Sequence, residues 1–203
     1  LRREKVIGVP TDTIYGLAAS ACSEKGIQRL YEAKQRAYHV PLAVCVGESS
    51  DVSKYADVAH LNPGLLEELL PGPVTLLLRK KTDDNPLSKA LNPDAALVGV
   101  RVHDSEFIRA VSRAYGHAIA LTSANQSGQP STLAVEEFEH LWSECACVFD
   151  GGRIAATRSG STIVDLSVPG EFSVKRAGEA CEAIQETLRR YGIERKRVPG
   201  EGE

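Results

Sequence analysis

Short apolar runs alternate with amphipathic segments along almost the whole chain, and this alternation limits the possible folds more than any other feature. Buried strands are predicted over residues 6–9, 42–46, 74–78, 97–102, 118–121, 162–166 and 172–176. Helices are predicted over about residues 24–34, 49–56, 62–70, 105–115, 135–142 and 179–191. Because strands and helices alternate, with a few direct strand neighbours, the sequence predicts one α/β domain with a mixed sheet flanked by helices.

The size and composition are those of a soluble globular protein. The 203 residues suffice for one well-buried domain, which we expect over residues 1–192, followed by a charged, flexible tail over residues 193–203. No run approaches the roughly 20 apolar residues of a membrane helix, and a net charge of −3 argues against general affinity for polyanions.

The five cysteines are an odd number, which suits a reducing compartment, and neither they nor the scattered histidines predict a metal site. Since Leu1-Arg2-Arg3-Glu4-Lys5 does not read as a signal peptide, we expect a cytoplasmic protein, or a mitochondrial one if a targeting segment has been removed.

Four polar clusters stand at strand ends or at a helix end. The first, Val9-Pro10-Thr11-Asp12-Thr13-Ile14-Tyr15-Gly16-Leu17, ends the first strand with hydroxyls and a carboxylate. The others are Lys34-Gln35-Arg36, the loop at residues 122–131, and Arg158-Ser159-Gly160-Ser161-Thr162. Each also has an ordinary explanation, namely a polar turn, cations at a helix C-terminus or a solvated loop. Because open α/β sheets usually bind ligands outside strand ends, the clusters together predict a binding site.

The candidate site residues are mainly cations and neutral hydrogen-bonding groups. They are the cations Lys34, Arg36, Arg101 and Arg176, the hydroxyls of Thr13, Ser123, Ser131 and Ser161, and the amide of Asn125. These groups suit phosphate and carboxylate oxygens, and they contain no obvious nucleophile–base pair. The chain has neither G-x-x-x-x-G-K-[ST] nor G-x-G-x-x-G, so the common nucleotide-loop families are not indicated. Each basic residue alone is expected to be a solvated surface charge, and only their convergence would make a site.

The ordered motifs resemble those of the YrdC-like threonylcarbamoyl-AMP synthases. In chain order they are Pro10-Thr11-Asp12-Thr13-Ile14-Tyr15-Gly16-Leu17, Lys34-x-Arg36, Ser123-Ala124-Asn125-x-Ser127-Gly128-x-Pro130-Ser131 and Gly160-Ser161-Thr162-Ile163-Val164-Asp165. Pro71-Gly72-Pro73-Val74-Thr75 and Val98-Gly99-Val100-Arg101 also fit the family. The resemblance covers about residues 5–178 and implies a twisted α/β fold with a basic concave surface.

The resemblance also implies an activity and a set of partners. Enzymes of this family join L-threonine, bicarbonate and ATP, and they release threonylcarbamoyl-AMP and pyrophosphate. A downstream threonylcarbamoyl transferase complex then modifies an adenosine of certain tRNAs, so contact of this chain with tRNA is expected to be indirect. Mg²⁺ is expected as cofactor, held mainly by ATP phosphate oxygens and water rather than by a protein site.

The implied roles divide the candidate residues into two groups. Thr13, Arg101 and Ser161 would hold L-threonine. The nucleotide and its phosphates would be held by Lys34, Arg36, Ser123, Asn125, Ser131 and Arg176. Of these, Lys34 and Arg36 are the predicted catalytic residues, because the reaction needs positioning and charge neutralisation more than a protein nucleophile.

The chain departs from the family pattern at three positions. Ala37 and Val40 replace a proline and a second lysine of the usual motif, and Cys45 stands where a histidine is common. A phosphate-side cation is therefore missing, which predicts weaker ATP binding.

One alternative function is a non-catalytic RNA-binding module. Only 5% of the residues are aromatic, which argues against it, because such modules stack bases on aromatic side chains. A carbamoyl-handling domain, as found in hydrogenase-maturing carbamoyltransferases, is a second alternative.

Overall fold

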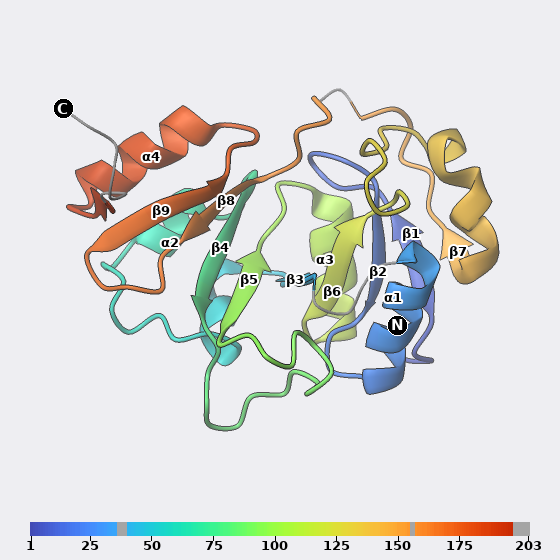
Figure 1. The fold of residues 1–203 in the computed structure, drawn as a ribbon, viewed down its shortest axis with the longest axis horizontal. Helices are drawn as coiled ribbons and strands as arrows, with labels where there is room; N and C mark the ends of the chain where they lie inside the picture. The colour runs from blue at the N-terminus through green and yellow to red at the C-terminus, as the bar shows by residue number, and fades with distance from the viewer. Residues whose placement is uncertain (36–39, 155–156, 197–203) are drawn as a thin grey trace.

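A single mixed sheet runs through the described part of the protein. The computed structural model describes residues 1–35, 40–154 and 157–196. Its strands lie in the order β10-β9-β8-β4-β5-β3-β6-β2-β1-β7 (Figure 1). The strands are β1 Val6–Val9, β2 Gly16–Ser20, β3 Ala43–Cys45, β4 Val74–Arg79, β5 Leu97–Arg101, β6 Ile119–Ser123, β7 Cys145–Val148, β8 Thr162–Asp165, β9 Glu171–Arg176 and β10 Glu194–Arg195. The predicted α/β class with a mixed sheet is confirmed, since parallel pairs such as β3 with β5 and antiparallel pairs such as β3 with β6 both occur.

The helices pack on both faces of this sheet. They are α1 Glu24–Lys34, α2 Leu65–Leu69, α3 Glu106–Tyr115, α4 Cys181–Arg190 and the 3₁₀ helices η1 Ser49–Lys54 and η2 Val135–Glu144. Ile27 and Leu30 of α1 belong to the larger apolar core, while Ile108 of α3 packs in a smaller one with Ile7 and Ile119. Neighbouring strand residues such as Val6 and Ile7 thus enter different cores, as alternation across a sheet requires.

Strand β2 is not predicted by the sequence pattern. Its residues, Gly16-Leu17-Ala18-Ala19-Ser20, contain no β-branched side chain. All five are buried, because β2 lies between β1 and β6. A Cβ on Gly16 would come within 2.9 Å of Leu121 and 3.1 Å of the Thr122 carbonyl oxygen, so the strand needs small residues where its neighbours approach closely.

Other elements also differ from the predicted ones in type or in their bounds. The segments predicted as helices at residues 49–56 and 135–142 are 3₁₀ helices, and Phe138 has non-helical angles inside η2. The chain does not leave the domain at residue 192, because Ile193 is buried and β10 pairs with β9 in parallel. Residues 193–195 therefore belong to the folded domain rather than to the predicted tail, and residues 197–203 lie outside the described residues. Among the described residues, no helix combines the length and apolar character needed to cross a membrane.

Candidate functional site

A cavity of about 210 Å³ lies over the short central strand β3. In Figure 1, β9, β8, β4 and β5 lie on one side of this strand, and β6, β2 and β1 lie on the other. The cavity is lined by all three β3 residues and by polar side chains from both sides. Five of the predicted site residues line it, namely Arg101, Ser123, Ser131, Ser161 and Arg176. Motifs that are far apart in the sequence therefore converge on one cavity.

The loop between β1 and β2 forms one wall. The Thr11 hydroxyl accepts hydrogen bonds from the backbone N–H groups of Thr13 and Ile14, both at 3.2 Å, and donates to the Ile14 carbonyl at 2.7 Å. The backbone of Tyr15 is tied to the loop after β6, because its N–H donates to the Thr132 carbonyl and its carbonyl accepts from Ala124 N–H. These bonds hold the loop in a fixed shape beside the cavity, so the polar turn is also part of the candidate site.

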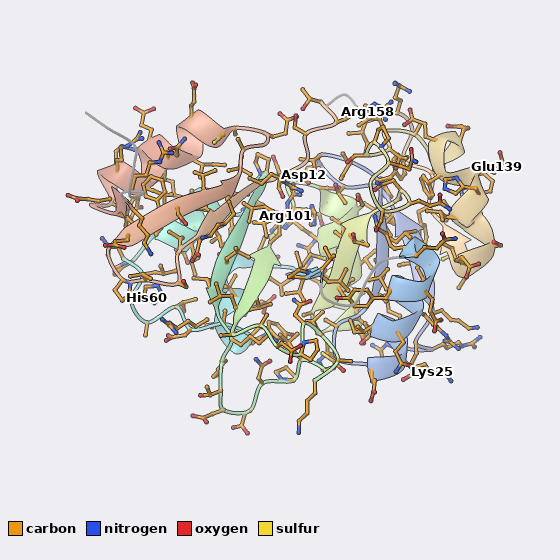
Figure 2. All side chains as sticks on the ribbon, in the orientation of Figure 1. Asp12, Lys25, His60, Arg101, Glu139 and Arg158 are labelled. Atoms are coloured by element: carbon orange, nitrogen blue, oxygen red, sulfur yellow. The ribbon has the colours of Figure 1, made fainter. Side chains whose placement is uncertain are left out.

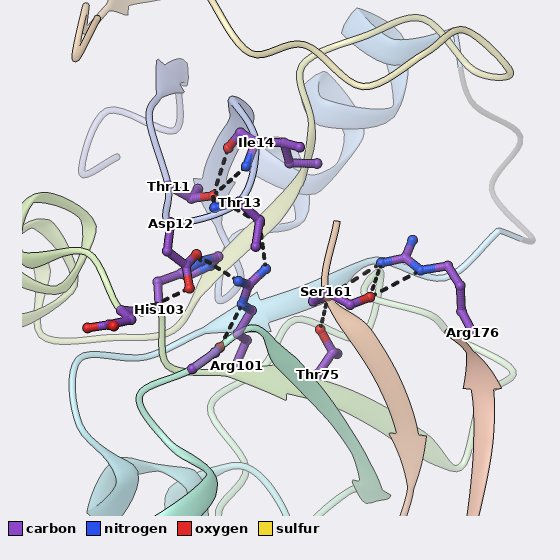
Figure 3. A network of polar contacts seen from close by, with 11 residues as sticks. Thr11, Asp12, Thr13, Ile14, Thr75, Arg101, His103, Ser161 and Arg176 are labelled. Atoms are coloured by element: carbon purple, nitrogen blue, oxygen red, sulfur yellow. Dashed lines mark hydrogen bonds and ion pairs between the residues drawn. The ribbon is translucent and has the colours of Figure 1, made fainter. Parts of the chain in front are cut away.

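Asp12 joins this loop to the end of β5 (Figure 3). Its Oδ1 accepts from Arg101 Nη2 at 2.7 Å and from His103 Nδ1 at 2.8 Å, and its Oδ2 accepts from the backbone N–H of Asp104 at 3.0 Å. The Arg101 Nη1 group also donates to the Thr13 hydroxyl at 3.2 Å. Figure 2 shows Asp12 and Arg101 together in the middle of the molecule. Thr13 thus reaches the site through Arg101, and it does not itself line the cavity.

Burial and charge set the protonation states of this cluster. Burial by itself raises the pKa of Asp12, but the hydrogen bond from His103 and the Arg101 charge outweigh it and hold that pKa well below its usual range. Burial, together with the Arg101 charge, lowers the pKa of His103 to about 4. The imidazole is therefore neutral near pH 7, and its contact with Asp12 is a hydrogen bond from a neutral donor rather than an ion pair.

The opposite wall is built around Ser161. Its hydroxyl lies 2.8 Å from the Thr75 hydroxyl, and its carbonyl oxygen accepts from Arg176 Nη2 at 2.7 Å. Gly178 lets the backbone approach this point, because a Cβ there would lie 2.6 Å from the carbonyl oxygens of Gly160 and Ser161. A side chain at position 178 would overlap backbone atoms, so glycine is required for the position of Ser161.

Lys34 and Asn125 lie behind the cavity lining. The Lys34 side chain is 1% exposed, and its Nζ donates to the Ser123 carbonyl at 2.8 Å, the Ser123 hydroxyl at 3.2 Å and Asn125 Oδ1 at 3.2 Å. The Asn125 amide nitrogen donates to the Gln126 and Gln129 carbonyls. Both residues fix the loop that carries Ser123 and Ser131. Asn125 lines a separate, open depression with Glu137 and Arg158.

Cys45 and Arg36 are two further positions of the family pattern. Cys45 lines the cavity and is 1% exposed, and burial raises the pKa of its thiol to about 12, so it is a neutral contact. Arg36 lies outside the described residues, and its role stays a prediction. The basic concave surface also stays a prediction.

Asp12, Thr75 and His103 are not among the site residues that the sequence predicts. Asp12 belongs to the first polar cluster, which was a usable signal, and His103 follows β5 two residues after Arg101. Thr75 lies inside β4, in an apolar run, and the family segment Pro71-Gly72-Pro73-Val74-Thr75 was the signal for it. The positions of Thr75 and His103 at the cavity become visible when the strands are brought side by side.

The described residues offer no protein cage for a metal ion. No three His, Cys, Asp or Glu side chains come together among them. The one carboxylate at the heart of the cluster, Asp12, already accepts three hydrogen bonds. The lining suits oxyanions, which arginine and hydroxyl groups bind, rather than a directly ligated cation.

Comparison with known proteins assigns the family. A family model named for Sua5, YciO and YrdC, and described as "Telomere recombination", matches residues 1–178. The chain belongs to the Sua5/YciO/YrdC family. A threonylcarbamoyl-AMP synthase from Bos taurus is 45% identical over 198 residues, which are 95% of this chain and 70% of that protein. The family match confirms the resemblance inferred from the four motifs.

Solved structures of the Sua5/YciO/YrdC family share the fold. Sua5 from Pyrococcus abyssi, crystallised with L-threonine, superposes with a TM-score of 0.83 at 28% identity. That match covers 96% of this chain and 56% of the Sua5 chain, so this chain spans little more than half the length of that relative. YciO from E. coli gives a TM-score of 0.76 at 22% identity over 88% of this chain and 85% of its own, which supports the fold alone.

Proposed function

We propose that this chain is a threonylcarbamoyl-AMP synthase, an enzyme of the nucleotidyltransferase type that makes threonylcarbamoyl-AMP and pyrophosphate from L-threonine, bicarbonate and ATP. One observation carries the proposal in the structure: residues of three of the four family motifs converge on a single cavity lined by two arginines and several hydroxyls. The similarity to curated synthases over 95% of the chain supports the same activity.

The chemistry requires groups that bind and orient anions. The threonine amine attacks the carbon of the bicarbonate-derived carboxyl group, which forms a carbamate and releases water. A carbamate oxygen then attacks the α-phosphorus of ATP, the bond to the β-phosphate oxygen breaks, and pyrophosphate leaves. Neither step needs a protein nucleophile, and both gain from fixed cations and hydrogen-bond donors beside the developing charge.

The cavity suggests how the candidate residues share this work. Arg101 and Ser161 line it and are proposed to hold L-threonine, while Ser123, Ser131 and Arg176 are proposed to hold the nucleotide. Thr13 and Lys34 are proposed to act through their hydrogen bonds to Arg101 and Ser123, and Asn125 through the bonds that fix the loop between Ser123 and Ser131. Arg36 is proposed to meet the phosphates. Mg²⁺ is proposed to arrive with ATP, held by phosphate oxygens and water.

Release of pyrophosphate tests the proposal directly. We expect release from ATP only when both L-threonine and bicarbonate are present. Equal release from ATP alone would point to a different enzyme. The RNA-binding alternative predicts binding of tRNA with a steep salt dependence and no ATP consumption. The downstream threonylcarbamoyl transferase complex remains the proposed consumer of the product.

A further inference from the structure

His103 has a buried nitrogen that no other group satisfies. Within the described residues, His103 Nε2 is the buried side-chain nitrogen or oxygen atom without a hydrogen-bond partner. The side chain is 3% exposed and lines the cavity. Buried polar atoms are nearly always paired in folded proteins, so an unpaired one on a residue that lines a binding cavity indicates a group that the ligand can satisfy.

The hydrogen bond at the other ring nitrogen fixes what Nε2 can do. The ionised Asp12 carboxylate can only accept, so His103 Nδ1 must carry the proton that it donates. Since the pKa of His103 lies near 4, the ring is neutral at physiological pH and Nε2 carries a lone pair. Nε2 is therefore an acceptor, and its partner must be an O–H or N–H donor.

The position of His103 indicates which molecule supplies that donor. Arg101 Nη2 and His103 Nδ1 both lie within 2.8 Å of the same Asp12 oxygen, so the two side chains are direct neighbours. The Arg101 guanidinium, which can bind a carboxylate, thus lies beside the His103 ring, whose Nε2 can accept a hydrogen bond from a neutral donor. A small molecule that carries both a carboxylate and a hydroxyl can meet both groups.

We propose that His103 is a substrate-recognition residue whose Nε2 accepts a hydrogen bond from the amino-acid substrate, with the side-chain hydroxyl as the donor. This inference rests on the proposed synthase function, in which that substrate is L-threonine. The hydroxyl suits the place better than an ammonium group, because a positive charge beside Arg101 would be repelled. The substrate N–H is the other possible source of the same hydrogen bond.

Two substitutions separate the two nitrogens of the ring. His103→Asn places its amide nitrogen where Nδ1 lies, so it can keep the bond to Asp12 while the Nε2 acceptor is lost. His103→Gln can place an amide oxygen near the position of Nε2, which restores an acceptor. Dissociation constants would be measured by titration calorimetry for L-threonine, for L-valine, which has a methyl group in place of the hydroxyl, and for 3-hydroxybutanoate, which lacks the amine. Thermal midpoints would be recorded for both variants.

We expect the wild-type protein to prefer L-threonine over L-valine by about tenfold or more, because L-valine leaves the acceptor unpaired. His103→Asn should reduce that preference to within about twofold, and His103→Gln should restore most of it. Weaker binding of both amino acids by His103→Asn, with 3-hydroxybutanoate unaffected, would support the acceptor role and assign the donor to the N–H.

Two results would overturn the inference. One is an unchanged preference and unchanged affinities in His103→Asn. The other is equal weakening of all three ligands with a lower thermal midpoint, which would mean a purely structural role. Wild-type pyrophosphate release is measured first: its absence would overturn the proposed function, and this inference with it. Activity with an unchanged preference would overturn this inference alone.

Discussion

The carboxylate of Asp12 and the guanidinium of Arg101 form a buried ion pair, with Oδ1 2.7 Å from Nη2 and both side chains less than 10% exposed. The pair joins the loop after β1 to the last residue of β5. It holds a cavity-lining arginine in one orientation, with Thr13 and the Gly72 carbonyl as further acceptors. The same contact therefore stabilises the fold and prepares the site.

Loss of the carboxylate should be costly. Asp12→Ala leaves the Arg101 charge buried without its counter-ion, and we expect a loss of about 3–5 kcal/mol in the free energy of unfolding. Denaturant unfolding measures this loss. Asp12→Asn is the matched control, because it keeps an acceptor of the same shape and should cost less. A change below about 1 kcal/mol in Asp12→Ala would contradict the stabilising role of the pair.

Stability should fall in mild acid because of His103. The unfolded chain takes up a proton on this ring near the usual histidine pKa of 6.5, whereas the folded protein resists protonation down to about 4. The contribution of the neutral His103 ring to the free energy of unfolding is therefore complete above about pH 6.5, and it is lost as the pH falls toward 4. At about 1.4 kcal/mol per pH unit, the loss amounts to roughly 3 kcal/mol.

Urea unfolding at pH 7, 5 and 4 tests this pH dependence. The control is His103→Asn, which removes the titrating ring and should flatten the curve between pH 6.5 and 4. Below this window the pKa of Asp12, which is held under its usual value of 3.8, should add a further loss in both proteins. If the free energy of unfolding fell equally with pH in the wild-type protein and in His103→Asn above pH 4, His103 would not be the group that causes the loss of stability.

The sequence predicts the class of fold because apolar runs and amphipathic segments have different periods. It does not predict β2, because a strand buried on both faces and built from glycine, alanine, leucine and serine has neither an alternating pattern nor β-branched residues. The motifs predict Arg101 and Ser161, which line the cavity. They do not reveal that Asp12 accepts hydrogen bonds from both Arg101 and His103, because contacts across about 90 residues depend on the strand order.

The contacts of Lys34 are a second feature that the sequence does not predict. A lysine in the last turn of a helix is normally solvated, where it also favours the helix dipole. Here the end of α1 lies against the loop after β6, so the ammonium is buried and donates to Ser123 and Asn125. The spacing from Ile27, Leu30 and Tyr31 places Lys34 on the buried stripe of α1, whereas Lys25 is exposed on the same helix, but that spacing does not identify the acceptors that Lys34 meets.

Replacement of Lys34 should therefore affect stability as well as nucleotide binding. Lys34→Met keeps most of the side-chain volume but leaves the Ser123 carbonyl and Asn125 Oδ1 without this donor. We expect a loss of about 1.5–3 kcal/mol in the free energy of unfolding and a higher KM for ATP. Lys25→Met, on the exposed face of α1, is the matched control and should change neither quantity. A Lys34→Met protein as stable as the control would show that Lys34 does not fix this loop.

Val40 is the position where a single added charge should improve the proposed enzyme. Its side chain is half-buried, its carbonyl accepts from the Tyr31 hydroxyl at 3.1 Å, and the next residue, Pro41, lines the cavity. The Asn92 amide pairs with both backbone groups of Leu42, at 2.8 Å each, which holds the chain on the other side. A longer side chain at position 40 therefore starts from a fixed backbone next to the candidate nucleotide site.

We expect Val40→Lys to lower the KM for ATP about two- to fivefold and to leave the KM for L-threonine nearly unchanged. The gain is small because a lysine–phosphate contact in water is screened and costs side-chain entropy, which leaves about 0.5–1 kcal/mol. Val40→Met, which adds length without charge, is the control and should leave the KM for ATP unchanged. If the side chain at position 40 instead points into the core, the buried ammonium would destabilise the protein. An unchanged KM for ATP together with a clear drop in the thermal midpoint would therefore contradict the placement of Val40 beside the nucleotide.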